Sequence, residues 1–343
     1  MALWFVREGF MANNTNAVES QKHELLSMYR RHVGMGSSYA LVDFPDHPNV
    51  GDSAIWLGEI ALLKKITGRS PRYVSTYANF DAAAFEAACP NGVLFIHGGG
   101  NLGDIWPSHQ IFREELLARF PQREIVQLPQ SIKFRDEAGT KHFAQLLERH
   151  PNFTLYVRDN PSYEFAKLKF ACKVDLMPDS AFGMGQQRRS PATRDALLLL
   201  RTDSERAGYD MAPFASIREG KIVDWLQDCP RTIRAARARR RLVKIVSGAD
   251  SNALRVRWYE WLANSRVKRG IAQLCEGQIV ITDRLHGHIL CVLLDIPHVA
   301  LDNDYGKVSN YINAWTHKYP SVRIAKSSAS ALKEYNDALI RAL

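Results

Sequence analysis

The sequence predicts an α/β protein built on parallel sheets, because strand-like and helix-like segments alternate along the chain. Short apolar runs typical of buried strands recur from 39–43 to 298–301, and a helical pattern follows most of them. The chain of 343 residues is also longer than one hydrophobic core usually holds, which predicts two domains.

The expected division of the chain has three parts. Residues 1–35 form an irregular N-terminal segment with a helix near 19–32, and two domains cover 36–188 and 189–343. The stretch 186–194 is polar and basic and contains a proline, so we expect it to be the linker. A helix over 329–343 closes the second domain.

Each expected element of the first domain follows from a local pattern. The apolar run 39–43 is the first strand, and the turn after it carries two prolines, an Asn and a Gly. Asp52 or Ser53 is expected to cap the amphipathic helix 54–66. The further expected strands are 72–75, 92–96, 124–128, 153–157 and 173–177, and the further expected helices are 80–89, 137–149 and one ending near 170.

The second domain shows the same alternation around one region that is hard to interpret. Expected strands are 195–200, 278–281 and 298–301, and expected helices are 254–274, one that contains 290–294, and 308–315. The region 206–245 shows no clear period.

The composition argues against a membrane-spanning protein, a secreted protein and a protein built on a zinc framework. No apolar run reaches the roughly 20 residues needed to cross a bilayer, and residues 1–23 lack the pattern of a secretory signal. The five cysteines are odd in number and scattered, without a CxxC pair, so we expect reduced thiols and no zinc framework. These features indicate a cytoplasmic protein.

The net charge of +9 indicates acidic partners. Seven of the cations lie in one short stretch: Arg231, Arg234, Arg237, Arg239, Arg240, Arg241 and Lys244. Nucleic acid, an anionic membrane surface and an anionic substrate all fit this charge, and so does a solvated helix face.

The stretch Thr282–Ile289 joins an apolar strand to a helix. The start of a helix offers backbone N–H groups and a positive dipole end to an anion. Arg284 can hold a carboxylate or phosphate through two hydrogen bonds, and His286 can transfer a proton near neutral pH. We therefore expect an anionic small molecule to be bound and protonated here; the alternative is an Arg and a His that only cap the helix.

A glycine turn follows the expected strand 92–96. His97-Gly98-Gly99-Gly100-Asn101 lets the backbone approach a ligand closely. A dinucleotide site is not favoured, because no acidic residue follows the next strand, and an esterase is excluded by the absence of a GxSxG motif. We expect a ligand-binding loop to which His97 and Asn101 contribute; the alternative is a tight turn.

Polar side chains follow other expected strands as well. Open α/β sheets bind ligands beyond the carboxyl ends of their strands, so these side chains are expected to lie at such a site. Asp283, His286 and His288 are too close together on one turn to converge on a metal ion, so no metal site is expected. The additional candidates are Asn49, Gly51, Asp52, Arg158, Asp179, Arg201, Asp203 and Lys307.

Six motifs occur in order between about Tyr39 and Val322: Asn49–Asp52, His97–Asp104, Leu128–Ser131, Arg158–Asp159, Arg284–Gly287 and Tyr305–Lys307. Together they resemble the polysaccharide pyruvyl transferases, and in particular the bacterial exopolysaccharide-cluster branch. The resemblance implies a GT-B-like fold, in which two Rossmann-like domains face each other across a cleft. It implies phosphoenolpyruvate as donor and a sugar hydroxyl pair as acceptor, with Arg158, His286 and Lys307 serving the donor.

The chemistry of the candidate residues suits this reaction. Ketal formation requires protonation of the phosphoenolpyruvate methylene carbon by an acid whose pKa lies near ambient pH, and His286 is the best candidate. Arg158, Arg284 and Lys307 can hold the carboxylate and neutralise the leaving phosphate. The reaction needs no metal ion or redox cofactor.

Two other classes stay open: a nucleotide-sugar glycosyltransferase on the same scaffold, and a non-catalytic protein that binds anionic glycan or nucleic acid through its arginines. The resemblance implies acceptors that are often lipid-linked at the inner face of the cell membrane. We therefore expect residues 231–244 to contact an anionic membrane peripherally, and no specific nucleic acid to bind.

Overall fold

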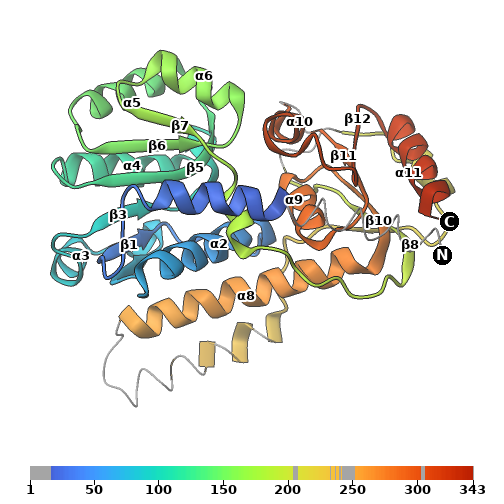
Figure 1. The fold of residues 1–343 in the computed structure, drawn as a ribbon, viewed down its shortest axis with the longest axis horizontal. Coiled ribbons are helices and arrows are strands. Elements are labelled where there is room, and N and C mark those ends of the chain that lie inside the picture. The colour runs from blue at the N-terminus through green and yellow to red at the C-terminus, as the bar shows by residue number, and fades with distance from the viewer. Residues whose placement is uncertain are drawn as a thin grey trace. The chain divides into compact units, whose positions relative to one another are not determined.

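The computed structural model describes residues 17–203, 208–231, 233–235, 237–238, 241, 252–302 and 306–342. Within these residues the chain is a mixed α/β protein with two parallel sheets, as predicted (Figure 1). The chain divides into two compact units that are interleaved in sequence. The seven-stranded unit contains residues 24–183 and 228–265, and the five-stranded unit contains 184–227, 266–343 and the residues up to His23.

The sheet of the seven-stranded unit has the order β2-β1-β3-β5-β6-β7, with β4 paired to β5, and all its pairs are parallel. Its central strands are buried along their whole length, as expected for a parallel sheet covered on both faces. The strands are β1 Tyr39–Val42, β2 Tyr73–Ser75, β3 Val93–Ile96, β4 Gly99–Gly103, β5 Ile125–Lys133, β6 Phe153–Val157 and β7 Lys173–Leu176.

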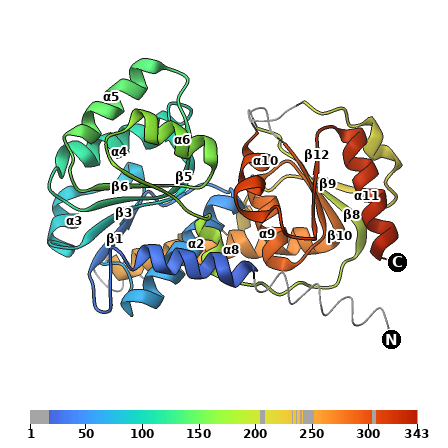
Figure 2. The ribbon, with the colours of Figure 1, turned by 45° about the horizontal axis from the view of Figure 1, so that its top comes forward.

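Helices cover both faces of this sheet (Figure 2). Successive strand residues point to opposite faces. Leu94 and Ile96 therefore belong to a core shared with α3 to α6, whereas the ring of Phe95 contacts Tyr29 in the helix over 17–29. The labelled helices are α2 Val50–Thr67, α3 Ala82–Ala88, α4 Pro107–Arg119, α5 Glu137–Glu148 and α6 Asn160–Lys169, with short 3₁₀ turns at η1 Tyr77–Asn79 and η2 Ser180–Met184.

Two predictions for this unit are wrong. Asn49, and not Asp52 or Ser53, caps α2: its backbone is extended, and its side-chain oxygen accepts the N–H of Gly51 at 3.0 Å. Strand β5 continues to Lys133, past the predicted end at 128. A register shift between Gln127 and Gln130 accommodates Pro129, which has no N–H to donate to the ladder.

The second sheet has the order β12-β11-β10-β8-β9 and is also entirely parallel. The strands are β8 Arg194–Leu199, β9 Lys221–Val223, β10 Gly277–Thr282, β11 His298–Leu301 and β12 Val322–Ala325. The strands predicted at 195–200, 278–281 and 298–301 are confirmed, whereas β9 and β12 were not predicted. Both are short and carry charged residues, so neither produces a clear apolar run.

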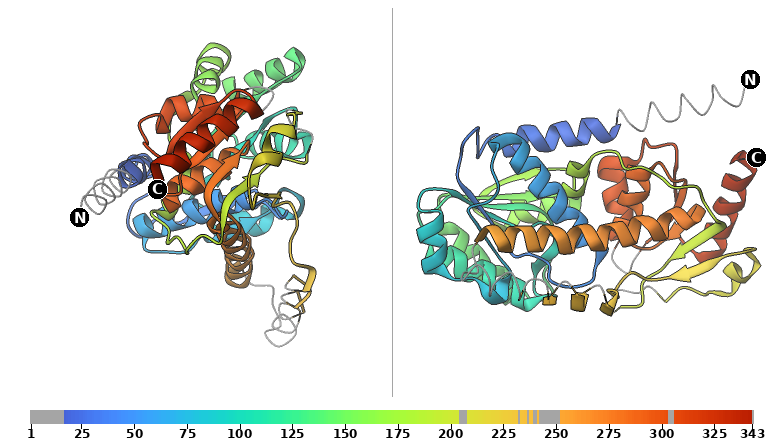
Figure 3. Two further views of the ribbon diagram at one scale, coloured as in Figure 1. Left: turned by 90° about the vertical axis from the view of Figure 1, so that its right-hand side faces the viewer. Right: turned by 90° about the horizontal axis from the view of Figure 1, so that it is seen from below.

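Helix α8 Asn252–Glu276 is the longest described helix, and it begins in one unit and ends in the other (Figure 3). The remaining elements of the five-stranded unit are α9 Leu285–Leu294, α10 Lys307–Tyr311, the π-helical turn η4 Ile312–Thr316, α11 Ser328–Ala342 and the 3₁₀ turn η3 Ala212–Ser216. Among the described helices, none combines the length and the apolar character needed to cross a membrane.

The packing of α2 against η2 gives a prediction for stability. A Cβ at Gly58 would lie 1.8 Å from the carbonyl oxygen of Ser180, so Gly58→Ala must push these elements apart. We expect the free energy of unfolding to fall by about 1–3 kcal/mol, as for other overpacked sites. Chemical denaturation of the two proteins measures the difference.

Gly139→Ala in α5 is the matched control, because the nearest atom to its added Cβ would be 3.7 Å away on Phe134. There alanine should raise the free energy of unfolding by up to about 1 kcal/mol through its better helix propensity. Equal stability of the two variants would contradict the packing explanation.

Candidate functional site

Strand β10 passes into α9 through a turn with little free space. A Cβ at Gly287 would lie 2.4 Å from Oγ1 of Thr282, so the first turn of α9 can approach the strand end only with glycine there. The Thr282 hydroxyl donates to the Leu199 carbonyl at 2.8 Å and accepts the N–H of Arg284 at 3.1 Å. Arg284 occupies the N-cap position, and His286 lies in the first turn of the helix.

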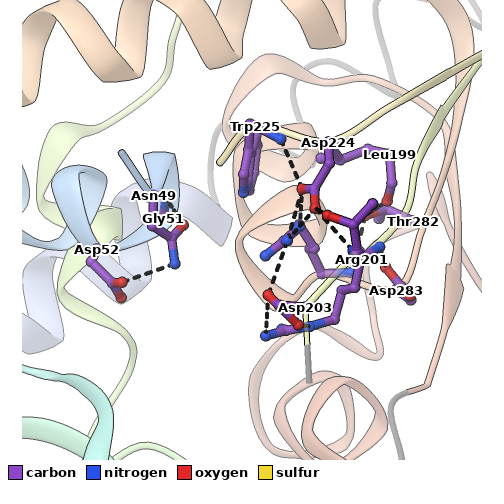
Figure 4. Close-up of polar contacts among 12 residues, drawn as sticks. Asn49, Gly51, Asp52, Leu199, Arg201, Asp203, Asp224, Trp225, Thr282 and Asp283 are labelled. Carbon is purple, nitrogen blue, oxygen red and sulfur yellow. Dashed lines mark hydrogen bonds and ion pairs between the residues drawn. The ribbon is translucent and has the colours of Figure 1, made fainter. Parts of the chain in front are cut away.

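Arg284 is buried in a cluster of arginines and carboxylates, the Arg284 cluster, which also contains Arg201, Asp203 and Asp224. Figure 4 labels these three partners. Its Nε and Nη2 donate to the two carboxylate oxygens of Asp224 at 2.7 and 2.8 Å, and Nη2 also reaches Asp203 at 3.2 Å. Arg201 binds both oxygens of Asp203, at 2.8 and 3.1 Å. The structure therefore brings Arg201, Asp203 and Arg284, all predicted from the sequence, into one network.

Asp224 is the centre of this network and was not predicted. Besides Arg284, it accepts the N–H and hydroxyl of Thr202 at 3.0 and 2.6 Å, and the N–H of Trp225 at 2.7 Å. It directly follows β9, the three-residue strand that the sequence does not reveal. An acidic residue next to a tryptophan at the end of a short apolar run is the only signal that could have indicated it.

Asp283 is buried beside the same cluster. Its Oδ1 accepts the N–H of Arg201 at 2.9 Å. Burial raises the pKa of Asp283 to about 6, although the Arg201 N–H and the guanidinium groups of Arg284 and Arg201 act in the opposite direction. The carboxyl can therefore change protonation state near neutral pH.

A cavity of about 320 Å³ opens at the carboxyl ends of β8 and β9. Its walls are largely apolar, and Arg201, Asp224 and Asp283 are the charged residues that line it. Such a cavity suits a small ligand with one apolar face and one polar edge. The lining residues are Leu200, Arg201, Thr202, Tyr209, Met211, Ile222, Val223, Asp224 and Asp283.

Lys307 and His286 lie in the same unit, at the carboxyl ends of neighbouring strands β11 and β10. His286 is buried, and half-buried Lys307 begins α10. Asp302 accepts the N–H of Val308 at 3.1 Å, which fixes the start of that helix. The motif residue Tyr305 lies outside the described residues, as do Ser204 and Glu205 after Asp203.

A chain of buried hydrogen bonds supports α9 from within. Nδ1 of His298 must donate to the Ile296 carbonyl, at 2.8 Å, because a carbonyl oxygen only accepts. Its Nε2 then accepts from Nδ1 of His288 at 2.7 Å, and Nε2 of His288 accepts the Thr316 hydroxyl at 2.8 Å. Burial and the neighbouring His298 and His286 lower the pKa of His288 well below its usual range, and burial lowers the pKa of His298 to about 4. Both rings are therefore neutral at pH 7.

In the seven-stranded unit, the predicted residues near α2 bond mainly with one another. The Asn49 side chain accepts the N–H of Gly51 and donates to Asp52 at 2.9 Å (Figure 4). Asn49 and Gly51 thus have a capping role in the structure, and Asp52 is half-buried next to them.

The glycine turn is partly strand. Gly99–Gly103 form β4, and Gly103 has a φ of 123°, with only 2.0 Å between its Cβ position and the Lys133 carbonyl oxygen. Asn101 accepts Nε2 of Gln130 at 2.7 Å and Nη2 of Arg113 at 2.9 Å. Strand packing therefore accounts for the glycine at 103, while His97, Gly98, Gly99, Gly100 and Asn101 stay predicted ligand-binding residues.

Arg158 is fully buried just beyond β6. Its Nη1 donates to Asp179 at 2.6 Å and its Nε donates to the Ser131 hydroxyl at 2.9 Å. Ser131 in turn donates to Asp159 at 2.6 Å. Arg158 and Asp179 are thus brought together at the expected edge of the sheet.

Sequence reasoning missed further buried charges of this unit, among them Glu59 and Arg113. Glu59 binds His97 at 2.7 Å, and Arg113 donates to Gln127 at 2.6 Å. Glu59 could have been found, because it interrupts the apolar face of α2 between Ile55 and Leu62. Arg113 could not, because α4 itself was not predicted.

The fold and these strand-end networks define an α/β protein whose polar networks lie at the carboxyl edges of parallel sheets, where open α/β sheets bind their ligands. Comparison with known proteins gives the family. The model of the Polysaccharide pyruvyl transferase family matches residues 49–305. Pyruvyl transferase 1 of Schizosaccharomyces pombe is 31% identical over 325 residues, which cover 89% of this chain and 76% of the relative.

Putative pyruvyl transferase EpsO of Bacillus subtilis is 30% identical over 323 residues, covering 90% of this chain and 96% of the relative. The chain therefore belongs to the polysaccharide pyruvyl transferase family, a family of transferases. A crystal structure of an uncharacterized Klebsiella pneumoniae protein aligns with a TM-score of 0.57 and 18% identity, over 90% of this chain and 99% of that one. This likeness concerns the fold alone.

The neutral histidine chain predicts an acid-sensitive fold. Above about pH 6.5 the histidines are neutral in both the folded and the unfolded protein. As the pH falls towards 4, unfolded histidines bind protons while folded His298, with a pKa of about 4, does not. The free energy of unfolding should therefore fall across this window, by roughly 3 kcal/mol for His298 alone.

Denaturation at pH 7.5, 6 and 5 measures this dependence. His298→Asn should be less stable at pH 7.5 but should lose less stability on acidification. His142→Gln, which removes an exposed histidine, should keep the wild-type slope. The assignment fails if His298→Asn has the same slope as the wild type.

Proposed function

We propose that the protein is a phosphoenolpyruvate-dependent pyruvyl transferase that forms a pyruvate ketal on a sugar of an exopolysaccharide or of its lipid-linked precursor. Membership of the family supports the transferase class. The observation that carries the proposal is the position of Arg284 and His286, at the N-cap and in the first turn of α9, directly beyond β10. This is the arrangement that binds an anion and supplies a proton.

In the proposed reaction, His286 protonates the methylene carbon of phosphoenolpyruvate, and the double bond supplies the electron pair. One sugar hydroxyl adds to the oxocarbenium-like C2 and loses its proton. The C–O bond to phosphate then breaks, phosphate leaves with the bonding electrons, and the second hydroxyl adds to close the ketal. One of the two hydroxyl protons returns to His286, and the other protonates the leaving phosphate.

Arg284 can hold one anionic group of the donor through one nitrogen of its guanidinium, Nη1. Nε and Nη2 are committed to Asp224 and Asp203. Nη1 forms no hydrogen bond with a described residue, so it is the group left for substrate. The carboxylates fix the plane of the guanidinium, which lowers the entropy lost when the donor binds.

Arg158 and Lys307 hold the other charges of the donor, and the polar residues at 49–52, 97–101, 201 and 203 contact substrate. This assignment requires a GT-B-like arrangement of two Rossmann-like domains, with the substrates in the cleft between them. The protein acts in the cytoplasm, with no cofactor besides phosphoenolpyruvate as co-substrate. Phosphate release from phosphoenolpyruvate, measured against a panel of glycosides and lipid-linked oligosaccharides, tests the reaction; transfer from a nucleotide sugar instead would assign a glycosyltransferase.

The first prediction of the proposed function concerns His286. His286→Ala should lower turnover by about 10²–10⁴-fold, the usual contribution of a positioned acid, while donor affinity changes much less. Single-turnover kinetics and donor binding separate the two effects. His317→Ala, which removes an exposed histidine from the same unit, should keep wild-type rates. Wild-type turnover of His286→Ala removes this residue from the mechanism.

The second prediction concerns the basic segment 231–244. Arg231, Arg234, Arg237 and Arg241 are exposed and helical, and Arg239, Arg240 and Lys244 lie outside the described residues. Each cation held near an anionic membrane contributes about 1 kcal/mol, so the segment should dock the enzyme beside a lipid-linked acceptor. Replacing these four arginines with Gln should abolish salt-sensitive sedimentation with anionic vesicles.

A charge-matched control replaces Arg119, Lys141, Lys167 and Lys169, which are exposed on α4 to α6, with Gln. This variant should sediment like the wild type. Equal loss of binding in both variants would mean that net charge alone acts, and unchanged binding of the segment variant would leave 231–244 as a solvated face.

A further inference from the structure

Helix α2 carries a glutamate on its buried face, next to the glycine turn that follows β3. Glu59 is fully buried, and its two carboxylate oxygens have separate partners. Oε1 accepts the N–H of Gly98 at 2.8 Å, and Oε2 lies 2.7 Å from Nδ1 of His97. Both partners belong to one short stretch, so the carboxylate fixes the orientation of the His97 ring.

The charges that act on this pair are mostly negative. Asp52 in α2 and Asp43 after β1 act on His97, and Asp179 after β7 acts on Glu59. Arg158 is already bound to Asp179. The Tyr29 hydroxyl stays un-ionised, because burial and the charge of Glu59 raise its pKa well above the usual range. A buried carboxylate in these surroundings favours a net neutral pair, in which Glu59 and His97 hold one extra proton.

The number of protons on the Glu59–His97 pair decides whether Nε2 of His97 carries a hydrogen. In the net neutral pair, Nε2 carries a hydrogen whether the extra proton lies on the Glu59 carboxyl or on Nδ1 of the ring. Burial alone would lower the pKa of His97, but the charge and hydrogen bond of Glu59, together with the charges of Asp52 and Asp43, raise it above its usual value. Nε2 forms no hydrogen bond with a described residue, although His97 is only 2% exposed. A buried N–H without an acceptor is costly, so a bound group is its expected partner.

The backbone of His97 is held as firmly as its ring. The side-chain amides of Gln127 and Gln130 donate to its carbonyl at 2.9 and 3.1 Å, and the Trp56 ring packs against the imidazole with 5.7 Å between centroids. A Cβ at Gly98 would lie 2.7 Å from the Pro129 carbonyl oxygen, so this turn has no room to shift. Nε2 is the polar atom of the His97 ring that is left to bind a ligand.

We propose that Glu59 is a positioning residue that keeps a proton on Nε2 of His97, and that this N–H binds an anionic oxygen of the substrate beside Gly98–Gly100. The inference rests on the proposed function, because phosphoenolpyruvate supplies such oxygens on its carboxylate and its phosphate. Either group gives the same charge-assisted hydrogen bond at the carboxyl end of β3. The role goes beyond packing, because it depends on the charge of Glu59 and not only on its shape.

Nuclear magnetic resonance of ¹⁵N-histidine-labelled wild-type protein tests the protonation state directly. The His97 signals are those missing from the spectrum of His97→Gln. At pH 7.5 they should report a proton on Nε2, and inorganic phosphate or pyruvate, added separately, should shift them. The phosphate and pyruvate arms identify which group of the donor binds. A bare Nε2 at this pH, or no response to either anion, overturns the proposal.

Kinetics test the role of the Glu59 charge. The amide of Glu59→Gln has one oxygen for two N–H donors, so His97 should lose its second proton at lower pH than in the wild type. At pH 8, kcat/KM should fall by about 10–100-fold, the usual worth of a hydrogen bond to a charged group, and it should recover towards pH 6 as His97 takes up its proton. A merely structural defect would not recover in acid, so a uniform loss, or wild-type activity at pH 8, contradicts the proposal.

His150→Gln is the matched control, because His150 is another buried histidine of the same unit, bound through Nε2 to the Phe120 carbonyl. Its activity and pH profile should match the wild type. If no acceptor supports phosphate release by the wild-type enzyme, the proposed function fails while the resonance test of Glu59 and His97 still stands. If Glu59→Gln does not fold, the wild-type resonances alone decide the proposal.

Discussion

Both units depend on one constraint, which is that every observed strand pair is parallel. Parallel pairing brings the carboxyl ends of all strands of a sheet to one edge, where the backbone groups beyond the ladder need other partners. Side chains supply them: Glu59 binds the N–H of Gly98, and Asp283 binds the N–H of Arg201. Buried carboxylates at this edge therefore stabilise the fold by accepting backbone hydrogen bonds, whatever part they take in a reaction.

The carboxyl edge of each sheet also carries charged side chains that are matched in pairs within the same unit. A buried pair adds little stability, but removing one partner leaves a charge that the interior cannot solvate. Only hydrogen-bond donors that are not used within these pairs, such as Nη1 of Arg284, are available to a substrate. Each paired side chain is consequently held in its orientation by another charge of its own unit. The pairs are Arg158 with Asp179, His97 with Glu59, and Arg284 with Asp224.

The sequence was enough to predict features that leave a pattern among neighbouring residues. The central strands are continuous apolar runs, and Arg201, Asp203 and Arg284 could be recognised because each follows such a run. Asp224 was missed because β9 has only three residues and pairs on one side, so its identity as a strand comes from tertiary contact. The partner of His97 was missed for a similar reason: Glu59 lies 38 positions away, and no local pattern connects them.

The interleaving of the two units bears on how the protein is made. Residues 228–265 belong with 24–183, and Tyr259 stacks on Phe44 with 4.0 Å between ring centroids. During synthesis the ribosome therefore delivers part of the other unit before the segment that completes the first. A fragment that ends near Gly183 would leave the Phe44 ring without its stacking partner, so we expect it to be recognised by chaperones and prone to aggregate. A gene split between residues 183 and 228 would yield two incomplete halves instead of two autonomous domains, because it would separate 228–265 from 24–183.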